Sequence, residues 1–150
     1  MQQKLILPKD FKEFIALLNK NEVQYLVVGG YALAVYGHPR FTGDIDIWIQ
    51  TNVDNASKLI STLSEFGFSS IKLEPSDLIT PNQVIQLGYP PLRIDILTSL
   101  DGIKFDNAYS NVNNVEVDNL SINFISKSDL ITNKKASGRY QDLADLEKLE

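Results

Sequence analysis

Residues 44–49 (DIDIWI) constrain the fold of this chain more than any other segment. Their side chains alternate strictly, which predicts a β-strand with one buried face. Asp44 and Asp46 then project from the same face, roughly 6.5–7 Å apart along the strand, and the isoleucines cover the other face. Two like charges so placed repel each other and raise the pKa of one carboxyl group unless a cation lies between them. The pattern therefore predicts a site for Mg²⁺ or Mn²⁺, which accept hard oxygen ligands.

A second segment, residues 92–97 (LRIDIL), carries the same signal. Its two isoleucines would face one side of a strand, with Arg93 and Asp95 on the other. If this strand lies beside the first, three carboxylates meet. The competing interpretation is that the aspartates face solvent on edge strands, which is the usual meaning of an isolated Asp-x-Asp pattern.

Helical and strand patterns are mixed along the whole chain. Apolar residues at helical spacing predict helices over 9–19, 31–36, 53–66, 129–137 and 140–149. Alternating or short apolar runs predict strands over 24–28, 44–49, 68–73, 84–87, 92–97, 115–117 and 120–125. Such a mixture, with several antiparallel pairs, predicts an α+β or α/β layered fold. The chain has 150 residues, so we expect a single domain spanning residues 1–150.

Composition excludes several classes of function. The chain has no cysteine, which rules out disulfides, thiolate nucleophiles and cysteine zinc sites. A formal net charge of -5 argues against a broad phosphate-binding surface, although it allows a local basic patch. The apolar run among the first residues is too short for a signal peptide, and no apolar run is long enough to span a bilayer. We therefore expect a cytoplasmic protein that does not interact with membranes.

Two blocks of the sequence resemble the nucleotidyltransferase superfamily with the polymerase-beta-like fold. Residues 28–30 (VGG), followed after a short helix by Arg40, Thr42 and the Asp-x-Asp strand, look like its signature. Residues 128–146 are similar to the ending of small bacterial and archaeal members related to AbiEii/AbiGii-type abortive-infection toxins. Together the blocks extend the resemblance over nearly the whole chain and argue against the interpretation as solvent-facing aspartates.

The resemblance implies an α+β fold in which helices flank a mixed sheet and three acidic residues hold two magnesium ions. By position, Asp44 and Asp46 would be the paired metal ligands, and Asp95 the third carboxylate, near the attacking hydroxyl. Gly29 and Gly30 would contact the triphosphate through backbone N–H groups. A turn without side chains also allows phosphate to approach a helix N-terminus, although a tight strand-to-helix turn alone would explain both glycines.

Four further residues are candidates for contacts with the triphosphate. Arg40 could offer a guanidinium fork and Thr42 a hydroxyl donor, or both could belong to a surface loop. Lys134 on the predicted C-terminal helix could neutralise phosphate charge, and Arg139 could contact the nucleotide or support the local structure. Without the resemblance, this basic run would be interpreted as a solvated helix face. His38 is interpreted as a loop residue.

The expected activity is transfer of a nucleoside monophosphate from a nucleoside triphosphate to an acceptor hydroxyl, with two metals stabilising the attacking and leaving oxygens. A macromolecular acceptor, RNA or protein, is favoured, and an antitoxin partner or a homodimer remains open. One alternative is a catalytically weak toxin–antitoxin interaction module, because a fold does not fix a function. Another is a small-molecule (antibiotic) nucleotidyltransferase, against which the shortness of the chain is an argument.

Overall fold

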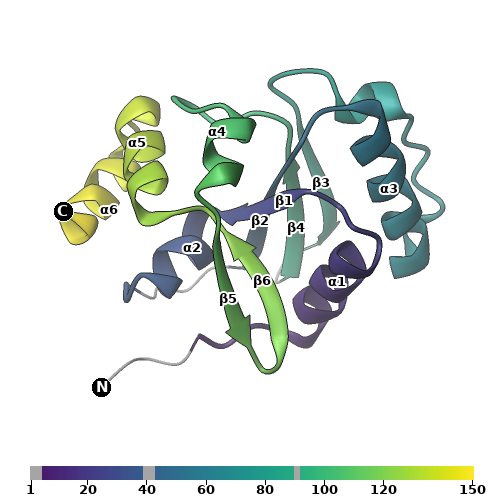
Figure 1. Ribbon diagram of the computed structural model, residues 1–150, viewed down its shortest axis with the longest axis horizontal. Coiled ribbons are helices and arrows are strands. Elements are labelled where there is room, and N and C mark those ends of the chain that lie inside the picture. The colour runs from purple at the N-terminus through teal and green to yellow at the C-terminus, as the bar shows by residue number, and fades with distance from the viewer. Residues whose placement is uncertain (1–4, 39–42, 90–91) are drawn as a thin grey trace.

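A mixed six-stranded β-sheet is the centre of the protein, as the computed structural model shows (Figure 1). The structure describes residues 5–38, 43–89 and 92–150. The strands are β1 Tyr25–Val28, β2 Asp44–Ile49, β3 Val84–Tyr89, β4 Leu92–Leu97, β5 Asn113–Val117 and β6 Leu120–Phe124. Their order across the sheet is β3-β4-β2-β1-β6-β5. The two strands that carry the aspartates, β2 and β4, are therefore neighbours.

Parallel and antiparallel pairs alternate across this sheet. The pairs β3/β4, β2/β1 and β6/β5 are antiparallel, whereas β4/β2 and β1/β6 are parallel. The two outer pairs agree with the antiparallel pairs expected from the sequence, and β5 turns into β6 at Asp118 and Asn119, both at positive φ. Each parallel pair needs a crossover connection, which the helices supply. The predicted α+β fold with a mixed sheet flanked by helices is confirmed.

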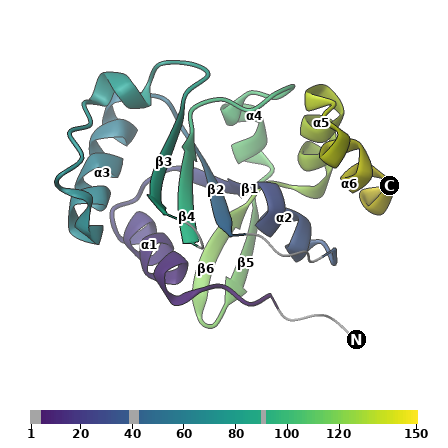
Figure 2. The ribbon, with the colours of Figure 1, turned by 180° about the vertical axis from the view of Figure 1, so that it is seen from behind.

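The helices lie on both sides of the sheet (Figures 1 and 2). Their bounds are α1 Lys9–Lys20, α2 Gly29–Val35, α3 Val53–Leu63, α4 Phe105–Ser110, α5 Lys127–Ser137 and α6 Tyr140–Leu149. In both views α1 and α3 lie together on one side, and α2, α4, α5 and α6 lie on the other. None of the helices within the described residues is long and apolar enough to cross a membrane.

The hydrophobic core forms where helix stripes meet the apolar faces of the strands. Phe11, Phe14, Ile15 and Leu18 form the buried stripe of α1, at the spacing expected of an amphipathic helix. The three isoleucines of β2 are buried in the same core. Each such side chain contributes about 1.5–3 kcal/mol through burial, so the register of β2 is strongly fixed. This register leaves the aspartates of β2 on the opposite face.

The strand predicted over residues 68–73 is wrong. The chain there leaves α3 through a π-type turn at 64–68, with Gly67 in a left-handed conformation at φ 108°, and continues without strand pairing. Phe68, the one aromatic residue of the predicted strand, packs instead against Phe66, with ring centroids 5.7 Å apart. The ring of Phe66 contacts Phe14 of α1, with centroids 5.2 Å apart. Apolar burial is thus achieved without the backbone pairing that the pattern suggested.

Helix boundaries differ modestly from the expectation. The helix predicted over 53–66 ends at Leu63, because the chain widens into the π-type turn. The six-residue helix α4 was not predicted, since a segment this short carries little periodic signal. At the C-terminus, α5 and α6 lie close to the predicted ranges 129–137 and 140–149. Ser126 caps α5 by accepting a hydrogen bond from the backbone N–H of Asp129, and Gly138 ends α5 in a left-handed conformation.

Candidate active site

The sheet register brings the three aspartates together. Asp46 of β2 lies directly opposite Asp95 of β4, and Asp44 lies opposite Arg93. One carboxylate oxygen from each aspartate lies within 4.8 Å of the others. We call Asp44, Asp46 and Asp95 the carboxylate triad. The expected meeting of three carboxylates on adjacent strands is therefore observed, whereas their roles in binding and catalysis remain predictions.

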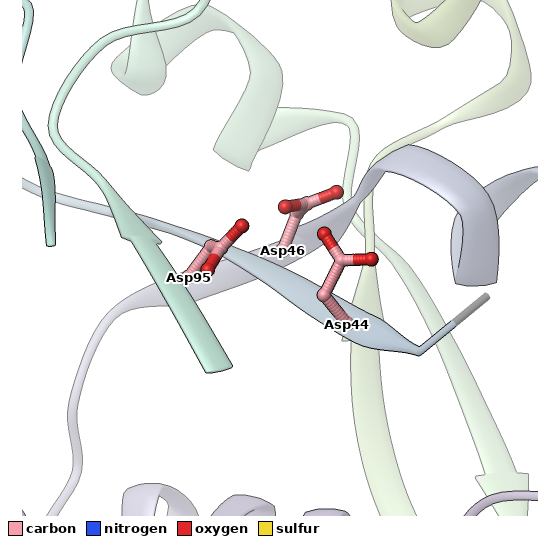
Figure 3. A group of neighbouring side chains, drawn as sticks. All are labelled: Asp44, Asp46 and Asp95. Carbon is pink, nitrogen blue, oxygen red and sulfur yellow. The ribbon is translucent and has the colours of Figure 1, made fainter. Parts of the chain in front are cut away.

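All three carboxylates point to the same side of the sheet (Figure 3). This is the side on which α2 and α4 lie, opposite the isoleucine face that the core buries. Trp48, next along the same face of β2, is buried against Phe105 of α4, with ring centroids 5.1 Å apart. The face thus changes along β2, from a buried aromatic contact to a partly open carboxylate cluster.

The surroundings of Asp46 disfavour the ionised form of its carboxyl group. Burial, followed by repulsion from Asp44 and Asp95, raises the pKa of Asp46 to about 7. At neutral pH this carboxyl group therefore holds its charge at a cost, which a bound cation would remove. Three converging carboxylates are also the hard oxygen donors that Mg²⁺ and Mn²⁺ prefer. The donor set and its incompletely compensated negative charge both fit a divalent cation.

Gly29 brings the strand-to-helix turn against the triad. Its φ is +69°, and a Cβ built on it would lie 2.1 Å from Oδ2 of Asp46. Val28, the preceding residue, pairs directly with Asp46 in the sheet. Only glycine satisfies both the backbone conformation and this close approach. Gly30 follows as a buried residue of α2, so the turn lies beside the carboxylates, while contact of either glycine with phosphate remains a prediction.

Arg93 belongs to the same cluster, although the sequence prediction gave it no role. Its Nε lies 2.8 Å from Oδ1 of Asp95, and its Nη2 lies 3.0 Å from Oδ2 of the same carboxylate. The same Nη2 also lies 3.4 Å from Oδ2 of Asp44. The signal was present in the sequence, because Arg93 and Asp95 are two residues apart and share a strand face.

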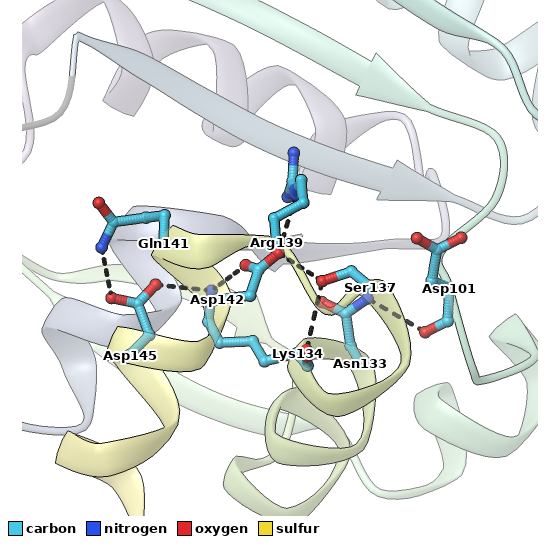
Figure 4. A network of polar contacts seen from close by, with 8 residues as sticks. All are labelled: Asp101, Asn133, Lys134, Ser137, Arg139, Gln141, Asp142 and Asp145. Carbon is cyan, nitrogen blue, oxygen red and sulfur yellow. Dashed lines mark hydrogen bonds and ion pairs between the residues drawn. The ribbon is translucent and has the colours of Figure 1, made fainter.

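Lys134 lies inside a buried ion cluster between α5 and α6 (Figure 4). Its Nζ lies 3.1 Å from Oδ1 of Asp142 and 2.9 Å from Oδ2 of Asp145. The lysine and both aspartates are buried. Ser137 and Arg139 donate further hydrogen bonds to Asp142. A phosphate contact by Lys134 would require its ammonium to leave these carboxylates. The observed contacts instead link α5 to α6 through a buried ion cluster.

Arg139 differs from Lys134 in being accessible. Its Nε donates to Oδ2 of Asp142 at 2.8 Å, while its side chain is 79% exposed. The charge of Arg139 acts on the triad, because it contributes to lowering the pKa of Asp46 against the stronger effects that raise it. Lys134 and Arg139 therefore differ, because Arg139 is accessible and its charge acts on Asp46 of the triad. Arg40 and Thr42 lie outside the described residues.

Comparison with known protein families finds a match over almost the whole chain. Residues 7–150 match the model of a family described as nucleotidyltransferase of unknown function (DUF6036). No curated protein matches the chain.

Solved structures with similar folds include three proteins related to nucleotidyl transfer. A candidate nucleotidyltransferase from Thermotoga maritima is 18% identical, with a TM-score of 0.65 and coverage of 97% of this chain and 95% of that chain. The lincosamide antibiotic adenylyltransferase LnuA, in its lincomycin-bound structure, is 15% identical, with a TM-score of 0.56 and coverage of 96% of both chains. An antigenic nucleotidyltransferase-like protein from Paracoccidioides brasiliensis is 15% identical, with a TM-score of 0.56 and coverage of 95% of this chain and 77% of that chain.

The comparison with LnuA removes one argument made from the sequence. The shortness of the chain counted against a small-molecule acceptor, yet the two chains match over almost their whole lengths. Length therefore does not distinguish the acceptor classes. The finer likeness to AbiEii/AbiGii-type toxins stays a prediction.

Proposed function

We propose, from the premise that the chain belongs to the DUF6036 family of nucleotidyltransferases, that it transfers a nucleoside monophosphate from a nucleoside triphosphate to an acceptor hydroxyl. Pyrophosphate is the leaving group. The observation that carries the proposal is the carboxylate triad, whose oxygens converge within 4.8 Å on one face of the sheet. A purely structural role would not require three aspartates to share a partly buried strand face, where each disfavours ionisation of the others.

The carboxylate triad would hold Mg²⁺ or Mn²⁺. Asp44 and Asp46 are the proposed paired ligands, and Asp95 the third. Bound divalent ions of this kind supply charge neutralisation for the attacking and leaving oxygens of a phosphoryl transfer. Burial and then repulsion raise the pKa of Asp46, and a bound ion would relieve the repulsion, so ion binding and ionisation of Asp46 would support each other.

The other proposed roles belong to the protein's own groups around the triad. Gly29 and Gly30 form a turn beside Asp46, where the backbone N–H groups would meet the triphosphate without interference from a side chain. Arg139 would add positive charge at the phosphates, and its accessible guanidinium supports this role. Asp95 would orient the acceptor hydroxyl or accept its proton. Arg40 and Thr42 are retained as proposed phosphate contacts on the sequence argument.

A macromolecular acceptor is the favoured substrate class. Two surface cavities lie away from the triad, one along α3 and residues 68–74, the other between α1 and residues 65–66. The accessible side of the triad is at Asp44, whose side chain is 36% exposed, and an open approach of this kind would suit a large acceptor that brings its own shape. A small-molecule acceptor is the second candidate, because the fold and extent match those of LnuA, described as an antibiotic adenylyltransferase.

Label transfer tests the proposal and separates the acceptor classes. Purified protein would be incubated with each α-labelled nucleoside triphosphate, Mg²⁺, total RNA and cell lysate, and the products separated by size and by nuclease or protease sensitivity. We expect label in RNA or protein, and its loss in the Asp95→Asn variant. Label only in small molecules would favour the second acceptor class. No transfer to any fraction would contradict the proposed activity and favour a binding module of a toxin–antitoxin pair.

A further inference from the structure

Arg93 is the positively charged group closest to the triad among the contacts described above, and the proposed reaction does not yet use it. Its guanidinium forms a two-point fork on Asp95, at 2.8 and 3.0 Å. A third, longer contact of 3.4 Å reaches Asp44. This arrangement differs from an ordinary surface ion pair, because one arginine bridges two of the three carboxylates that are expected to bind metal.

We propose that Arg93 is the internal counter-ion of the metal centre. Its guanidinium holds Asp95 in place and occupies Asp44 until a divalent cation takes that carboxylate. This inference rests on the proposed function, since it assumes that the triad binds a metal. It makes Arg93 a positioning residue that acts through Asp95, and also an internal competitor for the ion.

The charges of the cluster explain why such a counter-ion is needed. Three ionised carboxylates within 4.8 Å repel one another strongly, and Arg93 compensates only one of their charges. Arg93 therefore reduces the repulsion among the carboxylates in the metal-free folded protein, while the triad keeps enough negative charge to attract a divalent ion.

The geometry also indicates which contact is released first. The side chain of Asp95 is 7% exposed and receives two hydrogen bonds of normal length from Arg93. Asp44 is 36% exposed, and its contact with Arg93 is single and long. A bidentate fork is stronger and more directional than one long contact. An arriving ion should therefore displace the guanidinium from Asp44 while the fork continues to orient Asp95.

Two substitutions separate the charge of Arg93 from its fork. Arg93→Gln removes the competing charge, so Mg²⁺ or Mn²⁺ should bind about tenfold more tightly, the order expected when a unit charge beside the ion is removed from a partly screened site. Arg93→Lys keeps the charge but loses the fork, so ion affinity should stay near that of the wild type. Both variants should transfer nucleotide more slowly, because Asp95 loses its orientation.

Calorimetric titration with Mn²⁺ provides the test, with activity as a second readout. All variants should be titrated at the same pH, about 7.5, where ordinary carboxyl groups are ionised. The matched control is Lys20→Gln, which removes the same charge from a surface pair with Glu65, at 2.9 Å, near the end of α1. Circular dichroism confirms that each variant is folded.

The outcomes distinguish the two levels of the proposal. Tighter binding by Arg93→Gln, with Lys20→Gln and Arg93→Lys near the wild type, supports the counter-ion role. Equal or weaker binding by a folded Arg93→Gln variant overturns it and leaves the metal site standing. The same shift in Lys20→Gln would also overturn it, because the effect would then come from net charge. Absence of binding by the wild type would overturn both this inference and the proposed metal-dependent function.

Discussion

Replacing Lys134 with alanine tests whether the buried ion cluster stabilises the C-terminal helices. In the native protein the ammonium contacts Asp142 at 3.1 Å and Asp145 at 2.9 Å, and all three residues are buried. The substitution leaves two buried carboxylates without their shared cation. It also removes the aliphatic stem of the lysine from between α5 and α6.

The magnitude follows from the burial of the pair. Removing one partner of a buried ion pair costs about 3–5 kcal/mol, because the remaining charge stays desolvated. Ser137 and Arg139 still donate hydrogen bonds to Asp142, so the lower part of this range is expected. For a chain of this length, a loss of about 3 kcal/mol lowers the melting temperature by roughly 6–12 °C. The next residue supplies the control: Lys135 pairs with Glu150 at 2.9 Å but is 60% exposed, and its loss should cost at most about 1 kcal/mol.

Urea unfolding of the wild type, Lys134→Ala and Lys135→Ala measures the two costs under identical conditions. A further variant, Lys134→Met with Asp142→Asn and Asp145→Asn, should recover part of the loss, because it removes the stranded charges. Equal free energies of unfolding for Lys134→Ala and Lys135→Ala would refute the reasoning. So would normal stability of Lys134→Ala combined with a loss of nucleotide binding, which would return Lys134 to a direct phosphate role.

Three other predictions follow from the site. Gly29→Ala should cost about 1–3 kcal/mol of folding free energy, because alanine is strained at φ +69° and its Cβ would collide with the carboxylate of Asp46. Urea unfolding would measure the lost stability and metal titration the disturbed carboxylate, and wild-type values in both would contradict the prediction. Because the pKa of Asp46 is raised from 3.8 to about 7, the folded protein binds this proton more tightly than the unfolded chain does, so the metal-free stability contributed by Asp46 should be full below about pH 4, fall as pH rises to about 7, and stay level above. Mg²⁺ should restore stability above pH 7 in thermal melts, and a loss of stability on acidification from pH 7 to 5 would contradict this sign. Nucleoside triphosphates with Mg²⁺ should raise the melting temperature of the protein, and the rise should be smaller for Arg139→Gln than for the surface control Lys9→Gln. Equal rises for the two variants would contradict a phosphate contact by Arg139.

Local sequence patterns predicted the triad because they fix its geometry directly. The alternation of β2 and β4 determines which side chains share a face, and burial of the isoleucines prevents a shift in register. The neighbouring position of β2 and β4 was a conditional expectation, since the order of strands depends on long-range packing. Once the strands are adjacent, the opposition of Asp46 and Asp95 follows from the register.

Interactions between distant segments were beyond local patterns. Lys134 was predicted to contact phosphate, or without the family resemblance to lie on a solvated helix face, because its sequence neighbourhood does not show that α6 folds back to bring Asp142 and Asp145 around its ammonium. The pattern at 68–73 failed for a related reason. Its apolar residues suggested a strand, but aromatic packing on α1 and a left-handed glycine gave the segment a different path.

Binding of Mg²⁺ by the carboxylate triad is the most direct test of the central claim. Calorimetric titration would compare the wild type with Asp44→Asn/Asp46→Asn and with Asp10→Asn/Asp54→Asn, which removes two charges from exposed helix positions instead. The account predicts binding by the wild type and the surface variant, and its loss in the triad variant, because two of the three converging oxygen ligands then lose their charge. Equal binding by all three proteins would contradict a metal centre at these residues.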